Sequence, residues 1–144
     1  MTESEYLPLT LRTWTAPLRG TKEGRDYLAK GLLSELGEVS DVLKKATRNK
    51  TPPDEVRRRL VDEIGDVLWY SAVMDYEHEH DTGAFWFDLP PFVRTMLAGF
   101  NVNGLLLWAL REHGITADEC RAANIAKLAS RAERGVIQGS GGDR

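Results

Sequence analysis

The sequence predicts an all-α protein, a bundle of four or five helices. Apolar residues recur at three- and four-residue steps along most of the chain, which is the period of an amphipathic helix. No stretch shows the alternation of a strand, an internal repeat or low complexity. A chain of 144 residues is long enough for one buried core and too short for two, so we expect residues 1–144 to form a single domain.

Two long helices make up the first half of the predicted bundle. Apolar residues follow the helical period over residues 24–46 and again over residues 54–79. Residues 51–53, Thr-Pro-Pro, separate the two stretches, because proline disfavours helical geometry at the residue before it. Residues 81–83 end the second helix. We therefore expect a helical hairpin.

The second half of the chain is predicted to hold two more helices. Residues 84–91 are aromatic and contain two prolines, which favours a loop or a short turn. A helix follows over residues 92–113 and ends at Gly114, a residue type common just past a helix C-terminus. The last helix spans residues 117–134. Residues 136–144 are too rich in glycine to continue it, so we expect a flexible tail there.

Composition indicates an ordinary globular protein. Hydrophobic residues make up 42% of the chain and charged residues 28%, and no apolar run is long enough to cross a membrane. The N-terminus lacks the apolar stretch of a secretory signal, and the single cysteine, Cys120, cannot form an internal disulfide. These features predict a cytoplasmic protein. The net charge of −3 predicts no binding to duplex nucleic acid.

Two acidic pairs are the most informative feature of the sequence. Glu35 and Glu38 lie three residues apart in the first long helix, as Glu63 and Asp66 do in the second. Residues three apart share a helix face, so two such helices side by side bring four carboxylates together. Carboxylates this close repel one another unless a cation holds them, and Mg²⁺ and Mn²⁺ prefer oxygen ligands. The sequence predicts a metal site, with solvated surface acids as the simpler alternative.

Three ordered segments resemble the MazG-type nucleoside triphosphate pyrophosphohydrolases, which belong to the all-α NTP pyrophosphatase superfamily. They are residues 31–45, residues 62–70, which read DEIGDVLWY, and residues 123–128, which contain an Asn-x-x-Lys pattern. The family pattern is E-x-x-E, a variable spacer and E-x-x-D, and both acidic pairs match it in order. The resemblance covers residues 27–75 and 115–135, about half of the chain.

The resemblance implies an enzyme that hydrolyses an NTP or dNTP to the monophosphate and pyrophosphate, as in the removal of non-canonical nucleotides. Mg²⁺ is the implied cofactor and Mn²⁺ an alternative, since metal ions neutralise the polyphosphate and lower the pKa of the attacking water. One of the glutamates is also a candidate for orienting or deprotonating that water, and the sequence does not say which. The candidate catalytic residues and metal ligands are the same four acids, Glu35, Glu38, Glu63 and Asp66.

Five further residues are candidates for binding the substrate. Lys127 and Arg131 share a face of the last helix, which in the resembling family contributes basic contacts to the phosphates, and Asn124 precedes Lys127 by one turn. Lys44 follows the first acidic pair, and the Trp69 ring is a candidate for stacking on the nucleobase. Four of the five residues have a simpler interpretation. Asn124 would lie on the helix surface, Lys127 would pair with an acid, Lys44 would complement the helix dipole, and Trp69 would pack in the core or an interface.

The chain departs from the resembling family in two places. Ser34 stands where many members carry a further acid, which leaves the number of metal ions open. Residues 81–103 are longer and more aromatic than the resemblance implies, so we expect a variable insertion that forms an interface or a lid. We also expect a homodimer or a homotetramer, because a monomer would have difficulty covering the aromatic residues Phe85, Trp86, Phe87, Phe92 and Trp108.

Two alternatives to this function remain at the level of the sequence. A non-catalytic helical module would bind or regulate a partner and use the acids as a structural metal site. Hydrolysis of phosphoribosyl-ATP, the reaction of related histidine-pathway enzymes, is the weaker alternative, because nothing in the sequence specifies that substrate. The sequence also leaves the base and sugar preference open.

Overall fold

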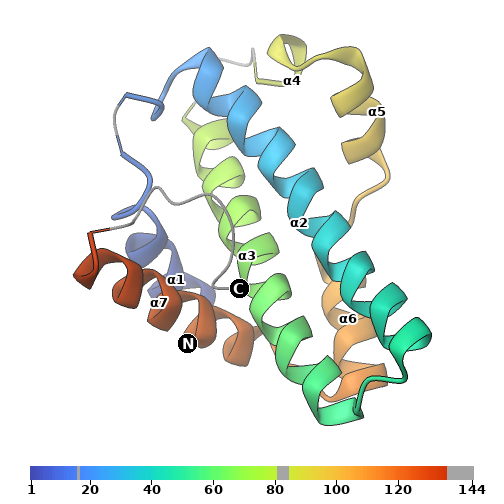
Figure 1. Ribbon diagram of the computed structural model, residues 1–144. Helices are drawn as coiled ribbons and strands as arrows, with labels where there is room; N and C mark the ends of the chain where they lie inside the picture. Colours follow the sequence, from blue (N-terminus) through green and yellow to red (C-terminus); the bar gives the residue numbers. More distant parts are fainter. Residues whose placement is uncertain (16, 81–84, 136–144) are drawn as a thin grey trace.

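The computed structural model describes residues 1–15, 17–80 and 85–135, and every regular element within them is a helix (Figure 1). The prediction of an all-α protein is therefore confirmed. The described residues contain more helices than the predicted four or five, because several are short. The helices are α1 (Glu3–Thr10), α2 (Lys22–Asn49), α3 (Pro53–Glu79), α4 (Phe85–Asp88), α5 (Pro91–Ala98), α6 (Val102–His113) and α7 (Ala117–Glu133).

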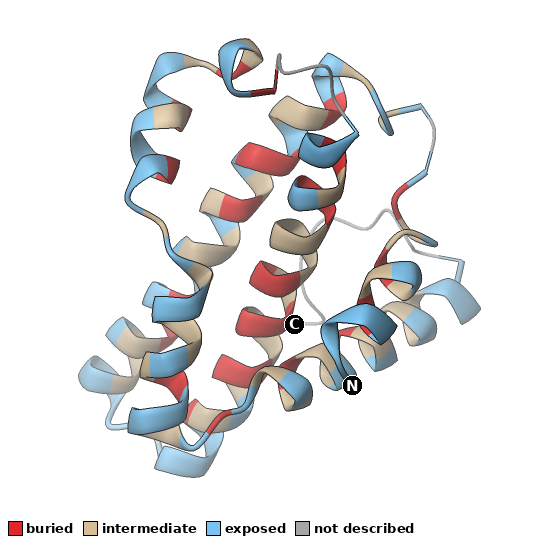
Figure 2. Cartoon of the chain, turned by 180° about the vertical axis from the view of Figure 1, so that it is seen from behind, coloured by how far each residue is buried: buried red, intermediate tan, exposed pale blue. Residues whose placement is uncertain are grey.

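Helices α2 and α3 form the predicted hairpin and supply much of the core. Lys50 ends α2 in the left-handed conformation (φ 52°). Pro53 begins α3 at a position where its missing N–H costs no helical hydrogen bond. Figure 2 shows buried residues along both helices, whereas α5 is largely exposed. The core residues that α2 and α3 contribute are mainly aliphatic, among them Leu28, Leu32, Val39, Val42, Leu60, Ile64, Val67 and Leu68.

A close contact between α2 and α3 fixes how the two helices are aligned. A Cβ atom at Gly31 would lie 2.1 Å from Cε1 of Tyr70, so glycine at this position lets the Tyr70 ring pack against the backbone of α2. The helices run antiparallel (Figure 1), so moving one turn along α2 corresponds to moving one turn back along α3. This alignment brings Glu35 of α2 level with Asp66 of α3.

Helices α7 and α1 pack against another side of α3. Helix α7 approaches α3 closely at Gly65, where a Cβ atom would lie 2.9 Å from the backbone oxygen of Cys120. Helix α1 contacts both α3 and α7 and buries Tyr6. This helix is absent from the predicted set, although Thr2 and Glu5 form a capping box that marks its start.

The segment after α3 departs from the prediction. The predicted single helix over residues 92–113 is wrong, because α5 ends at Ala98 and α6 begins at Val102 after a bend of 45°. Asn101 explains the break: its side-chain oxygen accepts a hydrogen bond from the Gly104 N–H (3.1 Å) and so caps a new helix. The preceding aromatic residues form the short helix α4, inside the predicted loop or turn.

Within the described part of the chain, no single helix combines the length and the apolar composition of a membrane span. The bent pair of α5 and α6, taken together, meets that criterion by length and composition alone. The predicted helix end at residues 81–83 and the predicted tail at residues 136–144 lie outside the described residues. So does the start of the predicted insertion, residues 81–84. The predicted stop at Gly114 is confirmed, since this residue caps α6 in the left-handed conformation (φ 63°).

Candidate metal centre

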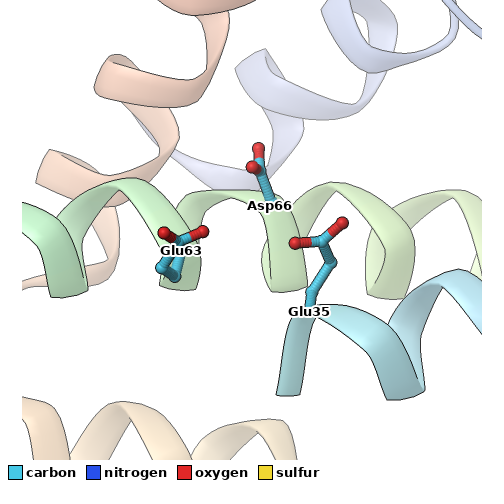
Figure 3. Close-up of side chains that lie close together, drawn as sticks. All are labelled: Glu35, Glu63 and Asp66. Atoms are coloured by element: carbon cyan, nitrogen blue, oxygen red, sulfur yellow. The ribbon is translucent and has the colours of Figure 1, made fainter. Parts of the chain in front are cut away.

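Three of the four predicted acids meet between α2 and α3. Glu35 projects from α2, and Glu63 and Asp66 project from α3 (Figure 3). One carboxylate oxygen from each residue lies within 4.8 Å of the other two. The alignment of the two helices at Gly31 explains the encounter, because it places the acidic turn of α2 level with the acidic turn of α3.

The three carboxylates fit a hard divalent cation. Ligand oxygens on opposite sides of Mg²⁺ lie about 4.2 Å apart, twice the usual Mg–O distance, so small side-chain rotations adapt this group to the ion. An all-oxygen donor set favours Mg²⁺, Mn²⁺ or Ca²⁺ over Zn²⁺. Across residues 1–15, 17–80 and 85–135, no hydrogen bond or ion pair engages the carboxylates of Glu35 and Glu63, which leaves them available as ligands.

The electrostatics of the cluster also favour a cation. Burial, together with the charges of Asp66, Glu38 and Glu63, raises the pKa of Glu35 to about 7. Burial and the neighbouring acids likewise raise the pKa of Glu63. Lys127 opposes both shifts, but one ammonium group does not balance four carboxylates. The site therefore carries an excess of negative charge that a divalent ion would relieve.

The fourth acid, Glu38, stands slightly apart. It is exposed and is not one of the three residues whose oxygens lie within 4.8 Å of one another. The helix alignment places it level with Glu63, and its charge contributes to the raised pKa of both Glu35 and Glu63. Glu38 therefore lies at the rim of the cluster, and its role as a ligand stays a prediction.

Asn124 and Lys127 of α7 both contact Asp66. Nδ2 of Asn124 donates a hydrogen bond to Oδ1 of Asp66 (2.8 Å), and the ammonium group of Lys127 bonds to Oδ2. Asn124 is 1% exposed, so its side chain has no surface on which to meet a substrate. The structure thus places Asn124 behind Asp66 rather than among the substrate contacts. Lys127 makes the acid pairing that was its simpler interpretation.

The other three predicted substrate contacts are not drawn into the cluster. Lys44 forms an ion pair with Asp41 (2.6 Å), and its hydrogen bond lowers the pKa of that carboxyl. Trp69 donates its indole N–H to the hydroxyl of Thr13 (3.0 Å) and packs against the rings of Trp14 and Tyr70. Arg131 makes no hydrogen bond or ion pair with the four acids in the part of the chain that the structure describes.

An open hollow of about 400 Å³ adjoins the cluster and shares Glu35 with it. Tyr27 and Tyr70 line this hollow with their ring centroids 6.2 Å apart, and Tyr27 is 48% exposed. The sequence prediction missed Tyr27. A signal for it exists, because Tyr27, Gly31 and Glu35 are spaced by four residues and so follow one ridge of α2. The remaining lining residues are Glu23, Asp26, Lys30, Gly31 and Ser34.

Fold and site together define an all-helical protein with a group of carboxylates between two antiparallel helices. The chain belongs to the family of the "Gene 37 protein" of Mycobacterium phage L5, to which it is 32% identical over 124 residues. The similarity covers 85% of this chain and 78% of the phage protein. No protein-family model matches the chain, and no solved structure matches it. The name of the phage protein states no activity.

Proposed function

We propose that the chain is a MazG-like nucleoside triphosphate pyrophosphohydrolase. Its reaction would convert an NTP or dNTP and water to the nucleoside monophosphate and pyrophosphate. The observation that carries the proposal is the meeting of Glu35, Glu63 and Asp66 between two helices, with Lys127 beside them. Three clustered carboxylates with too little positive charge nearby lower the stability of the folded state unless a cation binds them.

The acids of α2 and α3 would hold Mg²⁺, or Mn²⁺ in its place. A metal ion bound there neutralises the polyphosphate and lowers the pKa of an attacking water. The chain itself supplies two kinds of group: Glu35, Glu63 and Asp66 as ligands, and the exposed Glu38 as a further ligand or as the group that orients the water. Attack of the water oxygen on the α-phosphorus would form a new P–O bond and break the bond between that phosphorus and the oxygen bridging to the β-phosphorus, so pyrophosphate would leave.

Lys127 is proposed to change partners between the free and the bound protein. Its ammonium group now bonds to Asp66, and its side chain is 24% exposed. With a divalent ion on the same carboxylate, the ammonium group of Lys127 would be repelled from Asp66 and would be free to contact the incoming phosphates. Arg131 lies one turn further along α7 and would add a second positive charge to the same face.

The hollow beside Glu35 is proposed to receive the nucleoside. It adjoins the carboxylates, its volume of about 400 Å³ lies within the range of small-molecule sites, and it presents two tyrosine rings. Aromatic faces stack on nucleobases with little regard for the base. This assigns stacking to Tyr27 and Tyr70, because Trp69 does not line the hollow.

We also propose that the protein is a cytoplasmic homodimer or homotetramer. Helices α4, α5 and α6 carry several large apolar side chains that lie at the surface, and such area is commonly covered by a second subunit. Sedimentation at micromolar concentration would test this, and a strictly monomeric protein would contradict it. The exposed residues are Trp86, Phe87, Phe92, Met96, Leu107 and Leu110.

The test of the activity is pyrophosphate release from a panel of ribo- and deoxyribonucleoside triphosphates, with phosphoribosyl-ATP included. Wild type and Glu38→Gln are compared with Mg²⁺, with Mn²⁺ and with EDTA. Release that needs metal and is lost in Glu38→Gln supports the proposal and names the preferred base. If no nucleotide is hydrolysed by a folded wild type, the helical binding module is the better account.

A further inference from the structure

A chain of hydrogen bonds runs from the N-terminal helix to the carboxylate cluster. The hydroxyl of Tyr6 donates to Oδ1 of Asn124 (2.8 Å), and Nδ2 of Asn124 donates to Oδ1 of Asp66 (2.8 Å). Tyr6 and Asn124 are each 1% exposed, so water does not compete for these bonds. One residue each from α1, α7 and α3 forms this chain.

The chemistry of the three groups fixes the direction of the chain. An ionised carboxylate only accepts hydrogen bonds, so Asn124 must turn its NH₂ group toward Asp66 and its oxygen toward Tyr6. Tyr6 must therefore donate. Burial raises the pKa of Tyr6 above its ordinary value of 10.0, which keeps the phenol protonated. Phenylalanine at this position would keep the ring but leave the buried oxygen of Asn124 without a donor.

The two oxygens of Asp66 are held in different ways. Asn124 is neutral and buried, whereas Lys127 is charged and partly exposed. A cation that binds Asp66 repels the ammonium group of Lys127 but not the amide of Asn124. The amide would therefore keep its bond to Oδ1, whereas Oδ2 would become free for a cation once Lys127 moves away.

Close packing of α7 on α3 supports this arrangement. A Cβ atom at Gly65 would lie 3.1 Å from Cβ of Asn124, so the glycine allows Asn124 to approach the turn that carries Asp66. The Tyr6 hydroxyl lies 3.4 Å from the backbone oxygen of the same glycine. A phenol has one proton to donate, and the shorter distance to Asn124 (2.8 Å) assigns that proton to the amide oxygen.

We infer that Tyr6 and Asn124 are positioning residues, which hold Oδ1 of Asp66 so that Oδ2 is presented to the metal ion. This inference rests on the proposed function, because it gives both residues a task in the metal site. Neither side chain is exposed where a substrate could contact it. Tyr6 lies outside the segments that resemble the pyrophosphohydrolases, so the N-terminal helix contributes to the site in a way that the motifs do not reveal.

The test measures how tightly the purified full chain binds Mn²⁺, by titration followed with electron paramagnetic resonance. Asn124→Ala removes an outer partner of a metal ligand, a loss that typically costs about 10- to 100-fold in affinity, and Tyr6→Phe, which removes the donor to that partner, should weaken binding by about 10-fold, the lower end of this range. Tyr76→Phe is the matched control, because its hydroxyl bonds to Arg19 away from the cluster and its loss should leave Mn²⁺ binding unchanged. In an Asn124→Ala background, Tyr6→Phe should have no further effect, because Tyr6 acts through Asn124.

Two results would overturn the inference. One is equal Mn²⁺ affinity in Tyr6→Phe and Tyr76→Phe, and the other is a full effect of Tyr6→Phe in the Asn124→Ala background. If wild type binds no Mn²⁺, the proposed function fails instead. Hydrogen exchange of the Asn124 side-chain amide, followed by NMR, then tests whether Tyr6 holds Asn124 in place. Slow exchange in wild type and fast exchange in Tyr6→Phe support it, and equal exchange in both contradicts it.

Discussion

Two regions of the molecule differ in where they place polar and apolar side chains. One lies around α2, α3 and α7, and the other comprises α4 to α6. Between α2, α3 and α7, acidic and amide groups are drawn in among buried apolar residues, at Glu35, Asp66 and Asn124. Along α4 to α6, large apolar side chains such as Phe87 and Phe92 are left at the surface, 80% and 63% exposed. Clustered carboxylates cost stability unless a cation binds, whereas apolar side chains at the surface are typical of a face that a partner covers. The comparison therefore points to two kinds of ligand for one small protein.

The largest effect should come from the acids of the first region. Asp66→Asn or Glu63→Gln should lower pyrophosphate release by more than about 100-fold, because loss of an outer partner alone can cost that much. Glu63→Gln should nevertheless raise the free energy of unfolding measured in EDTA, since it removes repulsion from the cluster. Glu112→Gln, at an exposed position of α6, is the control and should change neither quantity. Normal turnover in Glu63→Gln would show that the cluster is not the active site.

The contact that aligns the acids gives the next largest effect. Gly31→Ala should lower the free energy of unfolding by about 1–3 kcal/mol, because its Cβ would lie 2.1 Å from the Tyr70 ring and overpack the helix contact. Gly37→Ala on the same helix meets nothing within 4 Å and should instead raise it by up to about 1 kcal/mol. Urea unfolding of both variants measures the difference. Equal effects of the two substitutions would mean that this contact does not fix the alignment.

The second region is tested by a change of oligomeric state. If the proposed oligomer forms through this surface, Phe92→Glu on α5 should convert it to a monomer, while the helical content stays as in wild type, because the Phe92 side chain is 63% exposed. Ala122→Glu places the same charge on an exposed position of α7 and should leave the oligomer intact. Sedimentation velocity separates the outcomes. An unchanged oligomer in Phe92→Glu would move the interface away from this surface.

The smallest effect is the pH dependence of stability without metal. The pKa of Glu35 is raised from 4.5 to about 7, so the folded state favours its neutral form. Its stabilising contribution is complete below pH 4.5 and is lost as the pH rises through 7. In EDTA, the free energy of unfolding of wild type should therefore fall over this interval more than that of Glu35→Gln. Parallel curves for the two proteins would argue against a buried, repelled carboxyl.

The same comparison explains what the sequence could predict. The acidic pairs could be predicted from the sequence, because residues three apart share a helix face and both helices were evident from their apolar period. The break before α6 was missed because Asn101 acts as a helix cap, and a cap inside an apolar stretch is easily taken for an exposed helical residue. The burial of Asn124 could not be predicted from the helical period, because it depends in part on α1, a helix that the periodicity did not reveal. Tyr6 carries no motif, so only its contact across 118 positions in the sequence identifies it.

The central claim is that Glu35, Glu63 and Asp66 hold a divalent cation between α2 and α3. A crystal grown with Mn²⁺ and measured for its anomalous signal tests this most directly. We expect a strong peak within ligand distance of all three carboxylates, with Lys127 moved away from Asp66 and Asn124 still bonded to it. Ordered carboxylates with no peak between them, and Lys127 still on Asp66, would contradict the claim.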